Sequence, residues 1–172
     1  MDNGAESYMV RSIIDQRVQA IRKCMAERDI SAVIIPSDDP HKSEYVAEHW
    51  QARKWVTGFS GSAGTAVITE SDAILWTDFR YYIQAQEQIN GSEFVLFKMG
   101  EAGVPGPEKW LKDNLKPNST VGIDGSLFSV NTVKKYQSVL TPESITMDTD
   151  VDVIGPIWKD RPPMPGSSAY LY

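Results

Sequence analysis

The sequence has a single cysteine, Cys24, so no disulfide bond can form within its 172 residues. It also has only two histidines, and no run of lysine or arginine exceeds two residues. The formal net charge is −6. Nucleic acid and anionic membrane surfaces are therefore poor partners, because both require a basic patch that neutralises phosphate groups. No apolar run approaches the ~20 residues that a membrane-spanning helix needs.

The first nine residues have neither the basic patch nor the apolar run of a secretory signal peptide. Together with the single cysteine, this pattern is typical of a protein in the reducing cytoplasm. An apolar fraction of 41% and an aromatic fraction of 10% indicate a folded globule, and the length suits one domain. We expect a disordered stretch over residues 1–7, a folded domain over 8–160, and a linker toward a second domain over 161–172.

Hydrophobic periodicity predicts alternating helices and strands. Residues 8–28 have the 3.6-residue period of an amphipathic helix, and residues 31–35 resemble a strand buried on both faces. Further strands are expected at 66–69, 73–77, 93–98, 120–124 and 144–147, and helices at 43–50, 79–89, 107–115 and 129–140, with a helical turn within 150–158. This alternation, with a hairpin over 66–77, predicts an α/β fold built on a mixed sheet flanked by helices.

In the expected helix over residues 129–140, Ser129 is a candidate N-cap. The residues Val130, Val133, Tyr136 and Val139 are predicted to face the core.

The segment 54–84 contains the densest set of motifs, and we interpret it as a strand, a glycine bend and a hairpin. Its glycines at 58, 61 and 64 lack the lysine of a phosphate-binding loop and the spacing of a dinucleotide fingerprint. Serine at position 62 also breaks the pattern of a nucleophile elbow. A structural bend is the favoured interpretation, and a surface loop that contacts a partner's active site is the alternative.

Two polar clusters are candidates for chemistry. Asp38, Asp39 and His41 could bind a metal, but an Asx-type turn with a helix cap also explains them and is favoured, since the short spacing and the proline oppose convergence. Asp78 and Arg80 follow a strand and could form a salt bridge that fixes the corner, or point outward to bind a peptide.

Several stretches together resemble the N-terminal domain of cytosolic Xaa-Pro aminopeptidase (aminopeptidase P). These are IPSDDPHKSEY from Ile35, GFSGSAGTAVIT from Gly58, LWTDFRY from Leu75 and IWKDRPP from Ile157, in the order that the family has them. The resemblance covers roughly residues 10–163. It implies a roughly six-stranded mixed sheet with a topology similar to that of ribonuclease H.

The resemblance also implies a function. In the family, peptide hydrolysis belongs to a C-terminal pita-bread domain that holds two divalent metal ions, usually manganese, with aspartate, glutamate and histidine ligands. None of those ligands matches a position here, so no catalytic residue, metal ligand or cofactor is expected in this chain. The family's N-terminal domain serves a homodimer and restricts access to the neighbouring active site to short, proline-containing peptides. The matching candidates for that contact are Phe59, Ser60, Asp78 and Arg80.

One residue departs from the family pattern. Phe79 occupies the position where the family usually has glycine, which disfavours a positive φ and adds bulk beside Arg80. Two other functions remain open. The same fold could serve as a stand-alone interaction scaffold without peptidase activity, or the loop at Asp38, Asp39 and His41 could form an autonomous metalloenzyme site.

Overall fold

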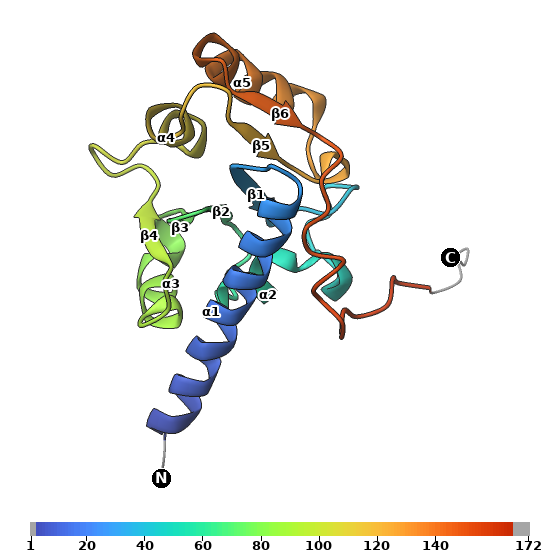
Figure 1. Ribbon diagram of the computed structural model, residues 1–172. Coiled ribbons are helices and arrows are strands. Elements are labelled where there is room, and N and C mark those ends of the chain that lie inside the picture. The colour runs from blue at the N-terminus through green and yellow to red at the C-terminus, as the bar shows by residue number, and fades with distance from the viewer. Residues whose placement is uncertain (1–2, 167–172) are drawn as a thin grey trace.

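The computed structural model describes residues 3–166, with side chains from Ser12 onward. Met1, Asp2 and residues 167–172 lie outside the described residues. The last six of these are half of the linker predicted over 161–172. Figure 1 shows a long N-terminal helix, a central sheet and an extended C-terminal segment. No helix in the described part of the chain is long and apolar enough to cross a membrane.

Six strands form one mixed sheet with the spatial order β4-β3-β2-β1-β5-β6. Antiparallel pairing joins β1 to β2 and β2 to β3, whereas the β1–β5, β3–β4 and β5–β6 pairs are parallel. The strands are β1 (Ala32–Pro36), β2 (Thr65–Thr69), β3 (Ala73–Thr77), β4 (Val95–Lys98), β5 (Thr120–Gly122) and β6 (Thr146–Asp148). The predicted fold class, a mixed six-stranded α/β sheet, is confirmed.

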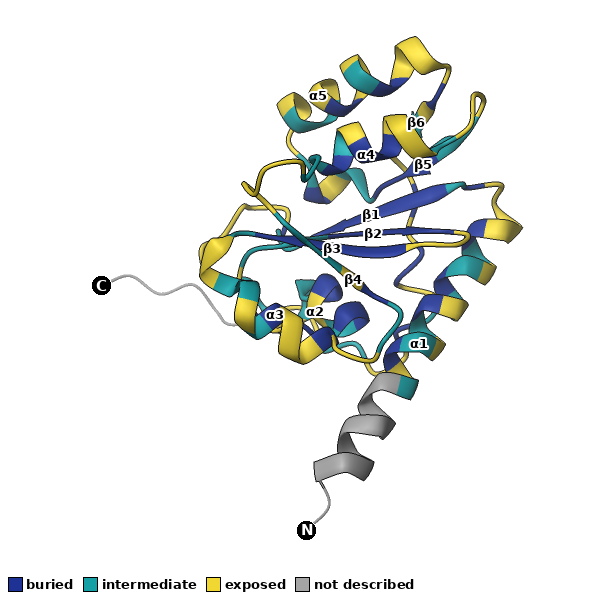
Figure 2. Cartoon of the chain, turned by 90° about the vertical axis from the view of Figure 1, so that its left-hand side faces the viewer, coloured by how far each residue is buried: buried dark blue, intermediate teal, exposed yellow. Residues whose placement is uncertain are grey.

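Helices cover both faces of the sheet, which gives three layers (Figure 2). One face packs against α1 (Asn3–Glu27), α2 (Ala52–Thr57) and α3 (Tyr82–Ile89), and the other packs against α4 (Pro107–Asn114) and α5 (Val130–Leu140). Short 3₁₀ helices are η1 (Glu48–Trp50), η2 (Phe79–Tyr81), η3 (Gly125–Leu127) and η4 (Thr141–Glu143).

The central strand β1 is buried throughout because it contributes to both cores. Successive side chains of a strand point to opposite faces. Val33 and Ile35 therefore join the core beneath α1, α2 and α3, while Ala32 and Ile34 join the core beneath α4 and α5. The uniformly apolar run that predicted a strand buried on both faces has this physical origin.

Several local predictions differ from the structure. Residues 54–57, interpreted as a strand, belong to α2, whose buried positions Ala52, Arg53, Val56 and Thr57 have helical spacing. The helix ends at Gly58 because that residue adopts the left-handed conformation, with φ of 72°. The predicted helix over 43–50 is reduced to η1, because Ala47 is extended (ψ 151°).

Two further predictions concern the two ends of the folded domain. The helical turn predicted within 150–158 is present as a single turn, in which the Trp158 amide donates to the Ile154 carbonyl at 2.9 Å. α1 begins at Asn3, within the stretch that the sequence assigned to a disordered N-terminus.

The N-cap of α5 is confirmed, since the Ser129 side chain accepts from the Thr132 amide. Val130, however, is 68% exposed, so its predicted place in the core is wrong. The buried positions of the helix are Tyr136 and Leu140, four residues apart, and Val133 is partly buried beside them.

Candidate functional site

The sequence motifs meet at one end of the sheet. In the antiparallel β1–β2 pair, Pro36 at the end of β1 lies opposite Thr65 at the start of β2, and Thr65 pairs in turn with Trp76 near the end of β3. The loops that follow β1 and β3, and the glycine loop 58–64 that precedes β2, therefore emerge together. In open α/β sheets this carboxyl end of the parallel strands is the usual place for a binding site.

Arg53 of α2 holds the glycine loop in place from inside the protein. The residue is only 4% exposed, and its guanidinium donates to the carbonyl oxygens of Phe59 and Gly61. Its Nε also donates to Ser37 Oγ at 2.9 Å, and this hydroxyl donates to the Gly64 carbonyl at 2.7 Å. Burial lowers the pKa of Arg53 to about 10, so the side chain remains a cation at neutral pH.

Phe59 is not a surface residue, and this corrects the prediction that its side chain faces a partner subunit. The ring is fully buried, with the Arg53 guanidinium carbon 4.7 Å from its centroid and the Tyr81 ring in edge contact at 5.7 Å. The buried Phe59 ring also requires glycine at position 61, because a Cβ there would lie 2.3 Å from Phe59 Cζ. The glycine loop is thus packed around Phe59, in agreement with the favoured structural bend.

Asp78 and Arg80 form the salt bridge that the sequence allowed. The contact is bidentate: Arg80 Nε donates to Asp78 Oδ1 at 2.9 Å and Arg80 Nη2 donates to Oδ2 at 2.7 Å. The same carboxylate caps η2 by accepting from the Arg80 amide at 3.0 Å. Hydrogen bonds from the Arg80 side chain hold the pKa of Asp78 below its usual value, and the carboxylate raises the pKa of Arg80 in return.

Phe79 occupies the corner without strain. The preceding residue, Asp78, has φ of −89°, and Phe79 begins the 3₁₀ helix η2, where no positive φ is required. Its ring is 77% exposed. The aromatic residue at this position therefore adds an apolar group to the surface next to Arg80, and it leaves the salt bridge intact.

Ser60 lies on the exposed side of the glycine loop, where α3 holds it. Gln84 Nε2 and Gln88 Nε2 each donate to Ser60 Oγ at 2.9 Å, and the Ser60 amide donates to Gln88 Oε1 at the same distance. Ser62 makes a second link, because its hydroxyl lies 2.7 Å from the Tyr81 hydroxyl. This hydrogen bond lowers the pKa of Tyr81.

The structure therefore places three of the four predicted residues on accessible loops at one end of the sheet, which we call the exposed edge. Ser60, Asp78 and Arg80 are accessible there, while Phe59 lies beneath them. A cavity of about 250 Å³ lies beside the loop, and its lining includes Ser37, Tyr45, Gln51, Ser60 and Ser62. Tyr45 is 88% exposed. The edge offers a guanidinium, hydroxyl groups and an aromatic ring, which can bind carboxylates or peptide carbonyls.

The loop after β1 contains the Asx-type turn favoured by the sequence. Asp39 is 4% exposed, and its Oδ1 accepts from the His41 amide at 2.9 Å and from the Ser43 amide at 3.0 Å. Hydrogen bonding from Ser43 is the main reason that the pKa of Asp39 lies below its usual value. No helix follows that this carboxylate could cap, so the predicted cap is absent from the described loop.

Metal ligation has no candidate among the described residues, since no three His, Cys, Asp or Glu side chains gather closely enough to hold an ion. The Asp39 carboxylate already accepts hydrogen bonds from two backbone amides. His49 Nδ1 lies 2.7 Å from the Pro162 carbonyl and must donate to it, so this nitrogen is protonated and cannot bind a metal. The donor set of the described residues therefore does not fit a two-metal centre.

Arg53 is the residue that sequence reasoning missed. The sequence interpretation placed a strand from Lys54 onward, directly after Arg53, and therefore missed the helical spacing that buries Arg53. A usable signal was present, because an arginine at a buried helical position five residues before a glycine loop needs acceptors, and that loop supplies free carbonyl groups.

Comparison with known proteins identifies the family. The model for the creatinase/prolidase N-terminal domain matches residues 17–161. Aminopeptidase P2 of Arabidopsis thaliana is 40% identical over 159 residues, which are 90% of this chain and 22% of that protein. The Xaa-Pro aminopeptidase ApepP of Drosophila melanogaster is 44% identical over 136 residues, covering 78% of this chain and 22% of the relative. The chain thus spans less than a quarter of the length of these two relatives.

Comparison with solved structures leads to the same family. The X-prolyl aminopeptidase of Caenorhabditis elegans, a cytosolic enzyme with a di-nuclear active site, superposes with a TM-score of 0.81 at 28% identity, over 87% of this chain and 26% of that one. The N-terminal domain of a metallopeptidase from Corynebacterium diphtheriae gives a TM-score of 0.57 at 19% identity, over 78% of this chain and 93% of its own length, and this likeness supports the fold alone. The chain belongs to the creatinase/prolidase N-terminal domain family, and its relatives are Xaa-Pro aminopeptidases.

Proposed function

We propose that this chain is the non-catalytic N-terminal domain of a cytoplasmic Xaa-Pro aminopeptidase, an enzyme that removes the residue preceding proline from short peptides. The observation that supports this most directly is the pairing of a family match over residues 17–161 with the lack of a metal-binding cluster among the described side chains. In this proposal two divalent ions, of which manganese is the expected identity, bind to a separate catalytic domain.

The role proposed for the chain itself is to shape access to the active site of a neighbouring subunit in a homodimer. Ser60, Asp78 and Arg80 are the residues for that contact, because they share one exposed edge and are held there by a rigid support. Arg80 is the central member, since a guanidinium paired in solvent with Asp78 can exchange this partner for a peptide carbonyl or carboxylate at low cost.

Hydrolysis of a short Xaa-Pro peptide with manganese tests the proposal. The chain alone should be silent, and a longer chain in which the catalytic domain follows Arg161 should be active and lose activity with a chelator. Replacing Arg80 with Gln in the longer protein should reduce hydrolysis without changing its dimerisation. Hydrolysis by the present chain alone would refute the proposal, and silence of both would favour the scaffold interpretation.

A further inference from the structure

A large cavity lies at the opposite end of the sheet from the candidate site. It has a volume of about 610 Å³ and opens where α1 ends, where β1 and β5 begin and where the β2–β3 turn lies. Strand register fixes this separation, because Ala32 at the start of β1 pairs with Thr69 at the end of β2. The volume lies within the roughly 300–1,000 Å³ typical of small-molecule sites.

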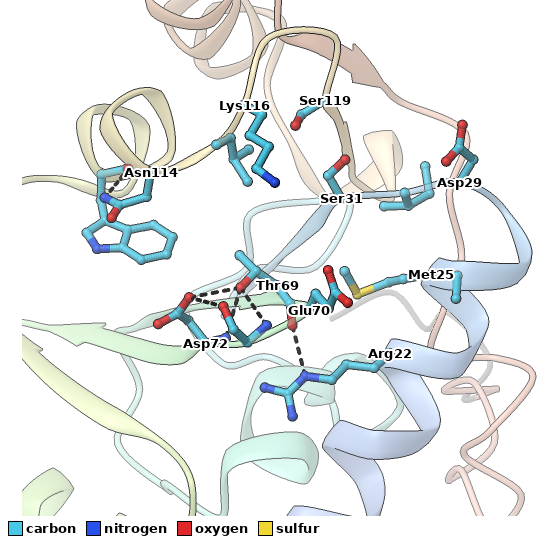
Figure 3. Close-up of a pocket in the computed structure, with 15 residues that line it drawn as sticks. Arg22, Met25, Asp29, Ser31, Thr69, Glu70, Asp72, Asn114, Lys116 and Ser119 are labelled. Atoms are coloured by element: carbon cyan, nitrogen blue, oxygen red, sulfur yellow. Dashed lines mark hydrogen bonds between the residues drawn. The ribbon is translucent and has the colours of Figure 1, made fainter.

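Opposite charges line this cavity without being paired. Lys116, which follows α4, enters from one wall, and Glu70, in the β2–β3 turn, lies on the facing wall (Figure 3). Neither side chain makes an ion pair or a hydrogen bond with another residue of the described chain, whereas Asp72 beside them accepts from the Ser71 and Thr69 hydroxyls.

Arg22, which also lines the cavity, makes its hydrogen bonds with other residues of the chain. Arg22 Nε donates to the Thr69 carbonyl at 2.9 Å and its Nη1 pairs with Glu93 at 2.6 Å, but Nη2 is buried without an acceptor. Because Nη2 has almost no accessible surface, a ligand in the cavity would not reach it, and the charged groups that can meet a ligand are Lys116 and Glu70.

Apolar side chains complete the walls. Met25, Ile30, Trp110 and Leu115 line the same cavity. A ligand with a negative end for Lys116, a positive end for Glu70 and an apolar middle matches this lining. The volume exceeds that of a single amino acid and suits a chain of about two or three residues at roughly 3.5 Å each.

We propose that the cavity between Lys116 and Glu70 binds short unblocked peptides, with the peptide carboxylate at Lys116, the peptide ammonium at Glu70 and apolar side chains against Trp110 and Leu115. The site needs no proline in the ligand and shares no residue with the edge that contains Arg80. It is thus independent of the proposed aminopeptidase function, and either can fail without the other.

The test is a titration of this ¹⁵N-labelled chain with the tripeptide Ala-Ala-Leu, followed by NMR. Saturable shifts are expected at the Ser31 and Ser119 amides and at the Trp110 indole. Acetylating the amino end, or amidating the carboxyl end, should each weaken binding by about tenfold, because each removes one charge-assisted contact.

Variants of Lys116 and Glu70 show which residue binds each end of the peptide. In Lys116→Gln the amidated and free peptides should bind equally well, and in Glu70→Gln the acetylated and free peptides should do so. Lys134→Gln and Glu87→Gln, which alter exposed charges on α5 and α3, are the matched controls and should retain both preferences. The absence of saturable shifts at ~10 mM peptide, or variants that still discriminate against blocked ends, would overturn the proposal.

Discussion

The guanidinium of Arg53 donates to the carbonyl oxygen of Gly61, eight residues further along the chain. A second bond to the carbonyl of Phe59 makes one buried cation the attachment point of the whole glycine loop. The loop in turn positions Ser62 against Tyr81, whose ring lies 5.2 Å from the Arg80 guanidinium carbon. The exposed edge therefore depends on a residue that is itself almost inaccessible.

Replacing Arg53 with Met should lower the free energy of unfolding by about 3 kcal/mol, because two buried carbonyl groups lose their donors. Urea denaturation measures the effect. Lys54→Met, at the exposed neighbouring position of α2, is the matched control and should leave the urea midpoint almost unchanged. Equal midpoints for the two variants would show that Arg53 does not anchor the loop.

Replacing Gly61 with Ala should destabilise the fold by about 2 kcal/mol, since the new methyl group overlaps Phe59 and would also lie 2.9 Å from Tyr81 Cδ1. Thermal unfolding compared with Gly166→Ala is the appropriate measurement, because nothing lies within 4 Å of a Cβ at position 166. If both variants have the same unfolding midpoint temperature as the wild-type protein, the described packing around Phe59 is wrong.

Acid stability should depend on Asp39. Its pKa is lower in the folded protein than the ordinary value of 3.8, so its stabilising contribution is complete above that value and disappears as the pH falls through the folded-state pKa. Asp39→Asn keeps the Oδ1 acceptor and removes the charge. The stability difference between wild type and variant should therefore shrink on acidification.

Urea midpoints measured from pH 6 to pH 2 provide the comparison for Asp39. The control is Asp38→Asn, at a neighbouring carboxylate that pairs with Lys42 at 2.8 Å on the surface. A difference between wild type and Asp39→Asn that grows toward low pH would have the wrong sign for this account.

Arg80→Gln should separate function from stability. The side chain lies in solvent and its partner is two residues away, so the urea midpoint of the variant should match that of the wild type. In a longer protein that contains the catalytic domain, the same change should lower the rate of Xaa-Pro hydrolysis by roughly tenfold or more. Arg28→Gln, at an exposed arginine just after α1, is the control for charge alone.

Much of the fold could be predicted from the sequence, because the strongest signals are local. The apolar period of α1, the continuous run in β1 and the Ser129 cap each report an arrangement that neighbouring residues impose on one another. The salt bridge at Asp78 was predictable for the same reason, since its partner Arg80 lies only two residues away.

The errors concern long-range packing. Trp55, Val56 and Thr57 are good strand formers, yet tertiary contacts place them in α2, because Val56 fills the core beneath the sheet. The sequence also placed Phe59 at the surface. Its burial follows from Arg53 and Tyr81, which lie six residues before it and 22 residues after it and close over the ring.

The most direct test of the central claim is the hydrolysis of a short Xaa-Pro peptide with manganese, measured for this chain and for a longer chain that includes the catalytic domain. The account predicts no hydrolysis by the present chain and chelator-sensitive hydrolysis by the longer one, diminished by Arg80→Gln. Hydrolysis by the present chain alone would contradict it, because the described residues contain no cluster that could hold the metal ions.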